Sequence, residues 1–258
     1  MTTNENINEV VDFLCEYASR LLSCGVHTSR VVRNTQRIAH SQNMWVTLEI
    51  FRSHITLTAS IRGTNHYVTR LVEVPKAPIS FSRNSALSSL SWIAYDNDPS
   101  LDELKEKYQQ ILEKPKLSPY LVLLLVALAN MSFCKLFGGN PMAMAIVFLG
   151  TALGFFLKQK MGQWKSNTFS TFILSAFVAS VFCATVANYF LNPEQTVIAM
   201  STSVLYLIPG VPLVNGVIDI IEGHIMIGAS RLIDAMLLIF SIAVGLGFTL
   251  SIFHDSLL

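Results

Sequence analysis

In the first part of this chain, hydrophobic residues recur either at helical spacing or in alternation with polar residues. Between residues 7 and 38 they recur at helical spacing, which predicts two amphipathic helices with a break at Gly25. Over 45–74 they alternate with polar residues, which predicts the three strands of an antiparallel meander with one face for helices. Helical spacing returns over 82–95 and 100–113. The first part of the chain is therefore predicted to be an α+β domain.

The second of these helices has two features of its own. Thr28 or Ser29 is expected to cap it, because hydroxyl side chains accept hydrogen bonds from the first free N–H groups of a helix. Arg30, Arg33 and Arg37 lie on its other faces. The simplest interpretation of this stripe is a solvated surface, and contact with a cytosolic anion or an inner-leaflet lipid is the alternative.

From residue 117 the apolar runs approach the ~20 residues that a helix needs to cross hydrocarbon. Five spans are predicted, with a polar loop at 158–167 between the second and the third. The five spans are 117–136, 142–157, 168–191, a fourth that begins near 196 and breaks at 209–210, and 232–253. The predicted domains are a cytosolic α+β domain, 1–114, and a five-span α-helical transmembrane domain, 115–258.

Basic residues give the predicted orientation, because short cytoplasmic loops of membrane proteins are enriched in Lys and Arg. Such residues gather on one side of the predicted spans, with Lys135 alone on the other. Those on the first side are Lys114, Lys116, Lys158, Lys160, Lys165 and Arg231. We therefore expect a multi-pass protein of the cytoplasmic (inner) membrane, with its N-terminal domain in the cytoplasm and its C-terminus outside.

Composition narrows the classes of function. The chain is near neutral, with 18 Lys+Arg against 17 Asp+Glu, so no nucleic-acid partner is expected. The four cysteines show no paired metal-ligand spacing, and neither a metal nor another cofactor is predicted. The first part contains no nucleophile elbow, phosphate loop or HExxH motif, so the chain is not expected to be an enzyme.

Helix-breaking residues interrupt the fourth predicted span. Pro209 and Pro212 each lack a backbone N–H and clash with the preceding turn, and Gly210 lies between them. A broken helix frees backbone polar groups that lipid cannot satisfy, and transporters use such breaks to line cavities. A second half-helix is expected from Val211, where free N–H groups would favour an anion such as a carboxylate.

Charged residues follow this break closely. Asn215 and Asp219 are four residues apart and would share one helix face. Arg231 could pair with Asp234 on its own helix, or hold a substrate carboxylate. It could also pair across the bundle with Asp219 or Glu222, and either acid could carry a proton that drives exchange.

The candidate substrate or ion pathway combines hydroxyl, helix-breaking and charged residues of this region. Its members are Ser201, Ser203, Tyr206, Pro209, Gly210, Pro212, Asn215, Gly216, Asp219, Glu222, Arg231 and Asp234. Two structural interpretations stay open beside it. The prolines could form a simple kink, or the charged residues could lie on the cytoplasmic rim of a straight span.

Two stretches resemble the threonine/serine exporter (ThrE-like) family, and the resemblance covers almost the whole chain. The first stretch is L-L-S-C-G-V-H-T-S-R-V at 21–31. The second and more specific stretch is P-G-V-P-L-V-N-G at 209–216, followed by Asp219, Gly223, Gly228 and Arg231. The resemblance implies a cytosolic N-terminal domain and the export of small amino acids or related acids.

Within that family the chain resembles the short, YjjP-like form, because long members carry a second membrane half. This form implies a separately encoded YjjB-like membrane subunit and the export of a dicarboxylate such as succinate; a homo-oligomer is the other possible assembly. We therefore expect a subunit of a secondary efflux transporter, in the lipid bilayer, for a small carboxylate-bearing metabolite of threonine/serine or succinate type. The alternatives are a non-transporting scaffold or sensor with a ligand-reading cytosolic domain, and a membrane-anchored enzyme.

Overall fold

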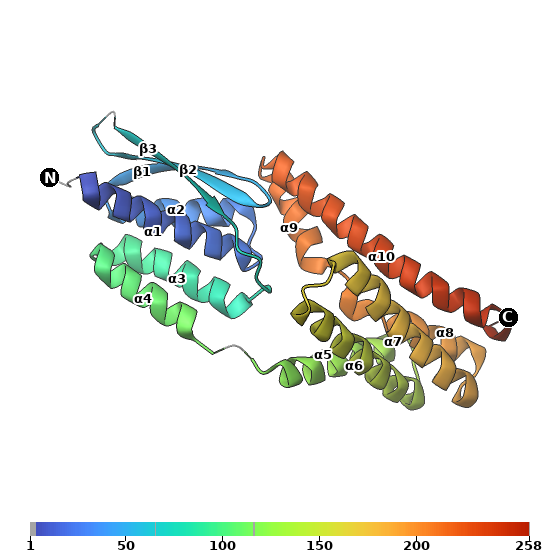
Figure 1. Cartoon of the computed structure of the whole chain (residues 1–258). Helices are drawn as coiled ribbons and strands as arrows, with labels where there is room; N and C mark the ends of the chain where they lie inside the picture. The colour runs from blue at the N-terminus through green and yellow to red at the C-terminus, as the bar shows by residue number, and fades with distance from the viewer. Residues whose placement is uncertain (1–3, 65, 116, 258) are drawn as a thin grey trace. The chain divides into compact units, whose positions relative to one another are not determined.

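Figure 1 shows the chain as a computed structural model that describes residues 4–64, 66–115 and 117–257. Lys116, at the predicted domain boundary, and Leu258, at the C-terminus, lie outside the described residues. Contacts divide the chain into two compact units: Met1–Pro115 with Gly210–Ile233, and Lys116–Pro209 with Asp234–Leu258. The segment that follows the predicted helix break therefore packs with the first part of the chain.

The first unit is built in layers. The three-stranded sheet lies against α1 and α2, and α3 and α4 cover the other side of these two helices (Figure 1). The elements of these layers are α1 (Asn4–Ser23), α2 (Thr28–Ser41), β1 (Met44–Ile50), β2 (His54–Ile61), β3 (Tyr67–Glu73), α3 (Phe81–Asn97) and α4 (Leu101–Glu113). Buried side chains such as Tyr17, Leu57 and Leu87 form one core among them.

The sheet is the antiparallel meander that the alternation predicts, in the order β1-β2-β3. Its register pairs Val46 with Ala59, and Ala59 with Val68, so these apolar side chains share one face. That face packs on the helices, whereas Trp45 and Tyr67 are exposed. The two-residue alternation therefore predicts both the strands and the face that they bury.

The helices α4 and α2 begin in different ways. Ser100 accepts a hydrogen bond from the N–H of Glu103 at 3.3 Å, so α4 has a side-chain cap. The prediction that Thr28 or Ser29 caps α2 is wrong, because α2 already begins at Thr28. Its N-cap residue is His27, whose side chain makes no capping hydrogen bond. The first N–H groups of α2 therefore need partners from elsewhere in the chain.

The second unit is helical. It contains α5 (Pro119–Leu136), α6 (Pro141–Gln163), α7 (Thr168–Phe190), α8 (Pro193–Thr202), the 3-10 turn η1 (Leu205–Leu207) and most of α10 (Ile225–Leu257). In the described ranges, α5, α6, α7 and Ile225–Phe253 of α10 are long and apolar enough to cross a membrane. Pro193–Leu207 and α9 (Gly210–Ile221) form a bent pair that gives a fifth candidate if it counts as one span.

One predicted loop is helical. α6 continues to Gln163, so Lys158 and Lys160 belong to this helix, and the prediction of a loop at 158–167 is wrong for its first half. The apolar run ends near residue 157, but lysine is a good helix former and its long stem packs on apolar neighbours. The fall in hydropathy near residue 157 therefore marks the change from apolar to polar side chains, whereas the helix itself ends at Gln163.

The interruption before α9 begins earlier than the prolines predict. α8 ends at Thr202, and α-helix resumes at Gly210. Asn130 of α5 is 2% exposed, and its Nδ2 donates to the carbonyl oxygens of Thr202 at 3.0 Å and Ser203 at 3.4 Å. Carbonyl groups in the last turn of a helix lack partners within it. A buried amide on a neighbouring helix therefore stabilises the interruption ahead of the prolines.

Candidate functional site

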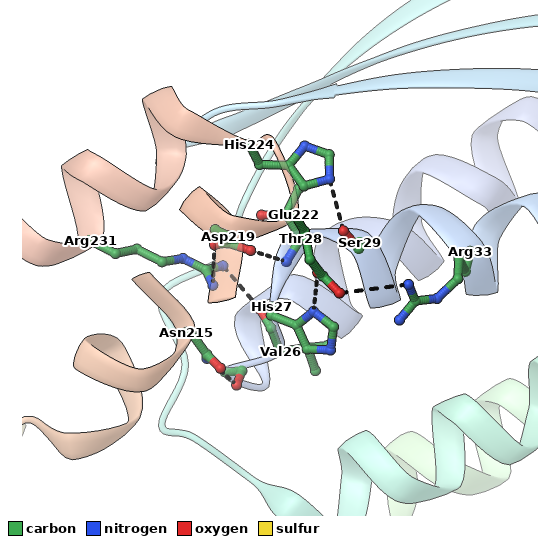
Figure 2. A network of polar contacts seen from close by, with 11 residues as sticks. Val26, His27, Thr28, Ser29, Arg33, Asn215, Asp219, Glu222, His224 and Arg231 are labelled. Carbon is green, nitrogen blue, oxygen red and sulfur yellow. Dashed lines mark hydrogen bonds and ion pairs between the residues drawn. The ribbon is translucent and has the colours of Figure 1, made fainter. Parts of the chain in front are cut away.

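The turn before α2 and the hairpin of α9 and α10 meet in a network of polar contacts (Figure 2). The turn comprises residues 25–29 and is named the 25–29 turn. The turn, and the hairpin as far as Ile233, belong to the first unit. Four predicted pathway residues lie in the network: Asn215, Asp219, Glu222 and Arg231. Their partners on the 25–29 turn were not part of the predicted pathway.

Asp219 is fully buried and lies at the N-terminus of α2. Its Oδ1 accepts a hydrogen bond from the N–H of Thr28 at 2.7 Å, and its Oδ2 lies 2.9 Å from Nη1 of Arg231. Helix N-termini attract anions, because their first N–H groups are free and the helix dipole is positive there. The Asp219 carboxylate thus supplies the cap that α2 lacks in its own sequence.

Arg231 connects this carboxylate to the backbone of the 25–29 turn. Its Nη2 donates to the carbonyl oxygen of Val26 at 3.0 Å, and its side chain is 16% exposed. Of the alternatives left open for Arg231, the pairing with Asp219 is present in the structure. Figure 2 shows both side chains reaching toward the turn from α9 and α10.

Three buried polar atoms here have no aligned hydrogen bond to the described part of the chain. They are Oγ1 of Thr28, Oδ2 of Asp219 and Nη1 of Arg231. The last two are in contact as an ion pair, but without the alignment of a hydrogen bond. Buried polar atoms are nearly always hydrogen-bonded. The network therefore keeps spare hydrogen-bonding capacity around a buried carboxylate.

Asn215 holds the first residue of the turn. Its Nδ2 donates to the carbonyl oxygen of Gly25 at 2.8 Å, and Asn215 and Asp219 share a face of α9 as their spacing predicts. Gly25 has a φ of 86°, and a Cβ at this position would lie 2.9 Å from Cγ1 of Ile79. Backbone conformation and close packing therefore both require glycine here.

Glu222 lies on the outer side of the network, with a side chain that is 32% exposed. Its Oε2 lies 3.1 Å from Nδ1 of His27, and its Oε1 lies 3.9 Å from Nη1 of Arg33. A hydrogen bond with Ser29, aided by the nearby His27, lowers the pKa of Glu222 below its ordinary value. The two acids that follow the break thus have different environments, one buried and one partly exposed.

The hairpin depends on close contact between its two helices. A Cβ at Gly216 would lie 2.9 Å from Cγ of Leu232, and one at Gly228 would lie 2.8 Å from the carbonyl oxygen of Gly216. Gly223 has a φ of 89° and turns the chain at the end of α9. These glycines bring Asp219 and Arg231 to the same side of the hairpin.

The other predicted pathway residues lie elsewhere. Tyr206 donates to the carbonyl oxygen of Ser175 at 3.2 Å, and Ser203 donates to that of Met200 at 2.6 Å, all within the second unit. The second unit also holds Ser201, Pro209 and Asp234, whereas the first holds Gly210, Pro212 and Gly216. The predicted pathway residues thus belong partly to the first unit and partly to the second.

Sequence reasoning missed the 25–29 turn as part of the site. The run at 21–31 marked this region through its family resemblance, but no chemistry was assigned to it. The groups that Asn215 and Arg231 bind are the carbonyl oxygens of Gly25 and Val26. Backbone groups are present at every position and leave no signal in a sequence, so only their place in the fold identifies them.

Within the described residues, no group of three or more His, Cys, Asp or Glu side chains is placed to hold a metal ion. The four cysteines are free and buried: Cys15, Cys24, Cys134 and Cys183. Burial raises the pKa of the Cys15 thiol to about 11, and it raises that of Cys24 as well. Thiols held in this protonated state are poor nucleophiles.

Comparisons with known proteins agree with the resemblance at 21–31 and 209–216. The sequence model of a family described as "Putative threonine/serine exporter" matches residues 12–253. No solved structure matches the chain. Curated relatives of the chain are described as transporters or exporters, and this family assignment supports the prediction that the chain is not an enzyme.

Two relatives share the description "Probable succinate transporter subunit YjjP". The protein of Klebsiella aerogenes is 31% identical over 144 residues, 55% of either chain, and that of Escherichia coli is 32% identical over 151 residues, 58% of either chain. A "Probable threonine/serine exporter" of Mycobacterium tuberculosis is 22% identical over 240 residues, which are 92% of this chain and 45% of that protein. This chain thus spans about half the length of the curated relatives it matches. With a family match from residue 12 to residue 253, the chain belongs to the threonine/serine exporter family.

Proposed function

We propose that the chain is a subunit of a secondary transporter that exports a small carboxylate-bearing metabolite across the cytoplasmic membrane. The substrate is an amino acid of threonine/serine type or a dicarboxylate of succinate type. The family, the four or five candidate spans and the descriptions of the relatives support this proposal. The observation that carries it is the buried, incompletely hydrogen-bonded pair of Asp219 and Arg231.

A buried ion pair of this kind is poorly explained by stability alone. Removing two charges from water costs several kcal/mol per ion, and their attraction offsets that cost only when geometry and hydrogen bonds are good. Here Oδ2 of Asp219 and Nη1 of Arg231 are not aligned, so the offset is incomplete. Ionisable groups kept in such surroundings are typical of substrate and proton pathways in membrane proteins.

The network holds a carboxylate in a way that also suits a substrate. Asp219 takes one backbone N–H and one guanidinium, which are donors that the carboxylate of an amino acid or dicarboxylate accepts equally well. In the proposed cycle, the substrate carboxylate competes with Asp219 for Arg231. Protonation of Asp219 weakens its hold on Arg231, so a proton carried by Asp219 couples to the export of the substrate.

In this proposal the network lies at the cytoplasmic mouth of the pathway. The partly exposed Glu222 lies on the side of the network that faces water, and Asp219 lies on the side that is buried in the protein. The opposite face of α9 exposes Val214, Val217 and Ile221, which suits contact with lipid or with another membrane chain. The N-terminal domain then faces the cytoplasm, and the C-terminus lies outside.

The proposed partner is a second membrane subunit of the YjjB-like kind, or another copy of this chain. The relatives of Klebsiella aerogenes and Escherichia coli are described as transporter subunits, which supports a partner. Two halves with an odd number of spans each have inverted topology, an arrangement that many secondary transporters use.

A non-transporting scaffold or sensor is the second candidate, and one observation favours it. The backbone of the 25–29 turn engages Asn215, Asp219 and Arg231 at once. The same contacts would serve to fasten the α9–α10 hairpin to α2 without any solute. A scaffold of this kind tolerates the loss of charge as long as the hairpin stays folded, whereas a carrier does not.

Efflux from loaded cells tests the proposal. Cells loaded with threonine, serine or succinate are followed with and without the chain, together with any small all-membrane protein encoded beside it. We expect the wild-type chain to raise the efflux of one substrate, and Arg231→Gln to lower that efflux about tenfold at equal amounts in the membrane. Arg30→Gln, which removes an exposed charge of α2, is the matched control.

Two outcomes would contradict this proposal in different ways. Equal efflux of all three substrates with and without the chain rejects the transport of these substrates. Raised efflux that tolerates both Arg231→Gln and Asp219→Asn rejects the role of the ion pair and leaves the network as a structural fastening.

A further inference from the structure

A lysine of the second unit has surroundings that the proposed cycle does not use. Nζ of Lys158 lies 4.7 Å from the ring centroid of Phe172. It lies 5.9 Å from that of Phe155 and 6.0 Å from that of Tyr206. The three rings come from α7, α6 and η1. The ammonium group therefore lies among three elements of the second unit.

The rings stabilise the ammonium group but leave its hydrogen-bonding capacity unused. Cation–π attraction extends to about 6 Å from a ring centroid, so Phe172 is the main contact and the other two rings lie at the limit. A lysine ammonium has three N–H donors. Within the described part of the chain, these contacts with rings are the interactions that Lys158 makes. The charge is thus held without a resident carboxylate.

A second unpartnered polar group lies on α7, on the helix face that carries Phe172. Oγ of Ser175 is buried and has no hydrogen-bond partner among the described residues. Ser175 is three residues from Phe172, on the same helix face. The carbonyl oxygen of Ser175 accepts a hydrogen bond from the hydroxyl of Tyr206 at 3.2 Å. Lys158 and Ser175 therefore both contact Tyr206, Lys158 at the ring and Ser175 through its backbone carbonyl group.

A glycine of α6 lets Tyr206 reach this position. Gly154 is four residues before Lys158 and shares its helix face. A Cβ at Gly154 would overlap the hydroxyl of Tyr206, and it would lie 2.8 Å from Cβ of Ala179 on α7. The side chain of Tyr206 thus reaches from the helix interruption to the α6–α7 contact because position 154 carries no side chain.

We propose that Lys158, Ser175 and Tyr206 form a binding site for a carboxylate of the transported metabolite. The ammonium group supplies the positive charge, the free hydroxyl of Ser175 supplies a hydrogen bond, and the rings, that of Tyr206 among them, exclude water from the contact. The identity of the ligand rests on the proposed function. Arg231 already faces the carboxylate of Asp219, whereas Lys158 faces none, so a carboxylate can bind at Lys158 without displacing a resident acid.

A neighbouring lysine provides the comparison within the same helix. Nζ of Lys160 lies 5.6 Å from the ring centroid of Phe156, which is on its own helix. Lys160 has no ring contact with α7 or η1 among the described residues. The side chain of Lys160 therefore lies along its own helix, as is common for lysines near helix ends. The side chain of Lys158 contacts rings on α6, α7 and η1.

The test uses the efflux assay and adds a binding measurement. In cells where the wild-type chain raises succinate, threonine or serine efflux, Lys158→Gln is expected to lower efflux about tenfold, and Lys158→Arg to keep much of it. Lys160→Gln is the matched control and should behave as the wild type. Normal efflux with Lys158→Gln overturns the Lys158 site and leaves the proposed function standing.

Lysine labelling gives a readout that does not depend on transport. Membranes of the organism that encodes the chain are treated with an amine-reactive reagent, with and without succinate, threonine or serine, and labelling is measured peptide by peptide. One of these solutes should slow the labelling of Lys158 severalfold, and succinamide, which lacks the charges of succinate, should not. The rate at Lys160 should stay constant. If none of the three solutes protects Lys158, the site does not exist, whatever the efflux assay shows.

Discussion

The side chain of Asp219 completes the N-terminus of a helix that begins 191 residues earlier, at Thr28. The donor is a backbone N–H and the acceptor a buried carboxylate, so neither partner is free to move without leaving the other unsatisfied. The start of α2 and the end of α9 are therefore one structural unit. A mutation that destabilises either segment is therefore expected to destabilise the other.

Asp219→Asn tests whether charge is what matters at this position. Asparagine keeps the shape of the side chain but leaves Arg231 without its counter-charge, so we expect a loss of about 3–5 kcal/mol in the free energy of unfolding. Denaturant unfolding of the purified full-length chain measures this loss. Adding Arg231→Gln should recover part of it, because no unpaired charge then stays buried. Strictly additive losses would show that the two charges do not interact.

Glu222 should make the stability of the 25–29 turn depend on pH. Because its pKa is lower in the folded chain than in the unfolded chain, Glu222 contributes stability above the unfolded pKa, and this contribution is lost as pH falls through the folded pKa. The difference in melting temperature between wild type and Glu222→Gln should therefore be largest at neutral pH and vanish in strong acid. A difference that grows toward acid pH would contradict the lowered pKa.

Gly216→Ala should separate α9 from α10. The added methyl group meets Leu232 and the backbone of Gly228, so we expect a loss of about 1–3 kcal/mol from overpacking. Gly247→Ala is the control, since no atom lies within 4 Å of a Cβ there and alanine is the better helix former. Thermal unfolding should show opposite shifts for the two variants. Equal shifts in melting temperature would show that the space beside Gly216 accommodates a methyl group.

Asn130→Ala should destabilise the interruption between α8 and α9. Its amide is the side-chain donor to the carbonyl groups of Thr202 and Ser203, and a buried carbonyl without a partner costs about 1–3 kcal/mol. Asn188→Ala removes an exposed amide from α7 and serves as the control. Hydrogen exchange over residues 196–208 should accelerate in the first variant and stay unchanged in the second. Unchanged hydrogen exchange in both variants would show that Asn130 does not stabilise the interruption.

Patterns that act over a few residues predicted most of the fold. The alternation over 45–74 predicts the sheet because side chains of a strand alternate between two faces, and Pro209 with Gly210 predicts a break because both disfavour a continuous helix. The spacing of Asn215 and Asp219 predicts their common face for the same local reason.

Features that depend on distant partners were not predictable in this way. Neither hydroxyl residue caps α2, because a carboxylate from α9 already occupies its first N–H. An amide on α5 stabilises the end of α8 at Thr202, and no property of the residues at 202–203 predicts that donor. Hydropathy likewise placed Lys158 in a loop, since a sequence does not show the rings of α7 and η1 that surround it.

The buried state of the natural cysteines has a practical use. Cys15 and Cys24 are protonated and shielded, and Cys134 and Cys183 are enclosed by neighbouring side chains. A water-soluble thiol reagent is therefore expected to react little with the natural cysteines of the unmodified chain. Single cysteines introduced one by one from 206 to 222 can report which positions meet water, without first removing any natural thiol and disturbing the packing around it.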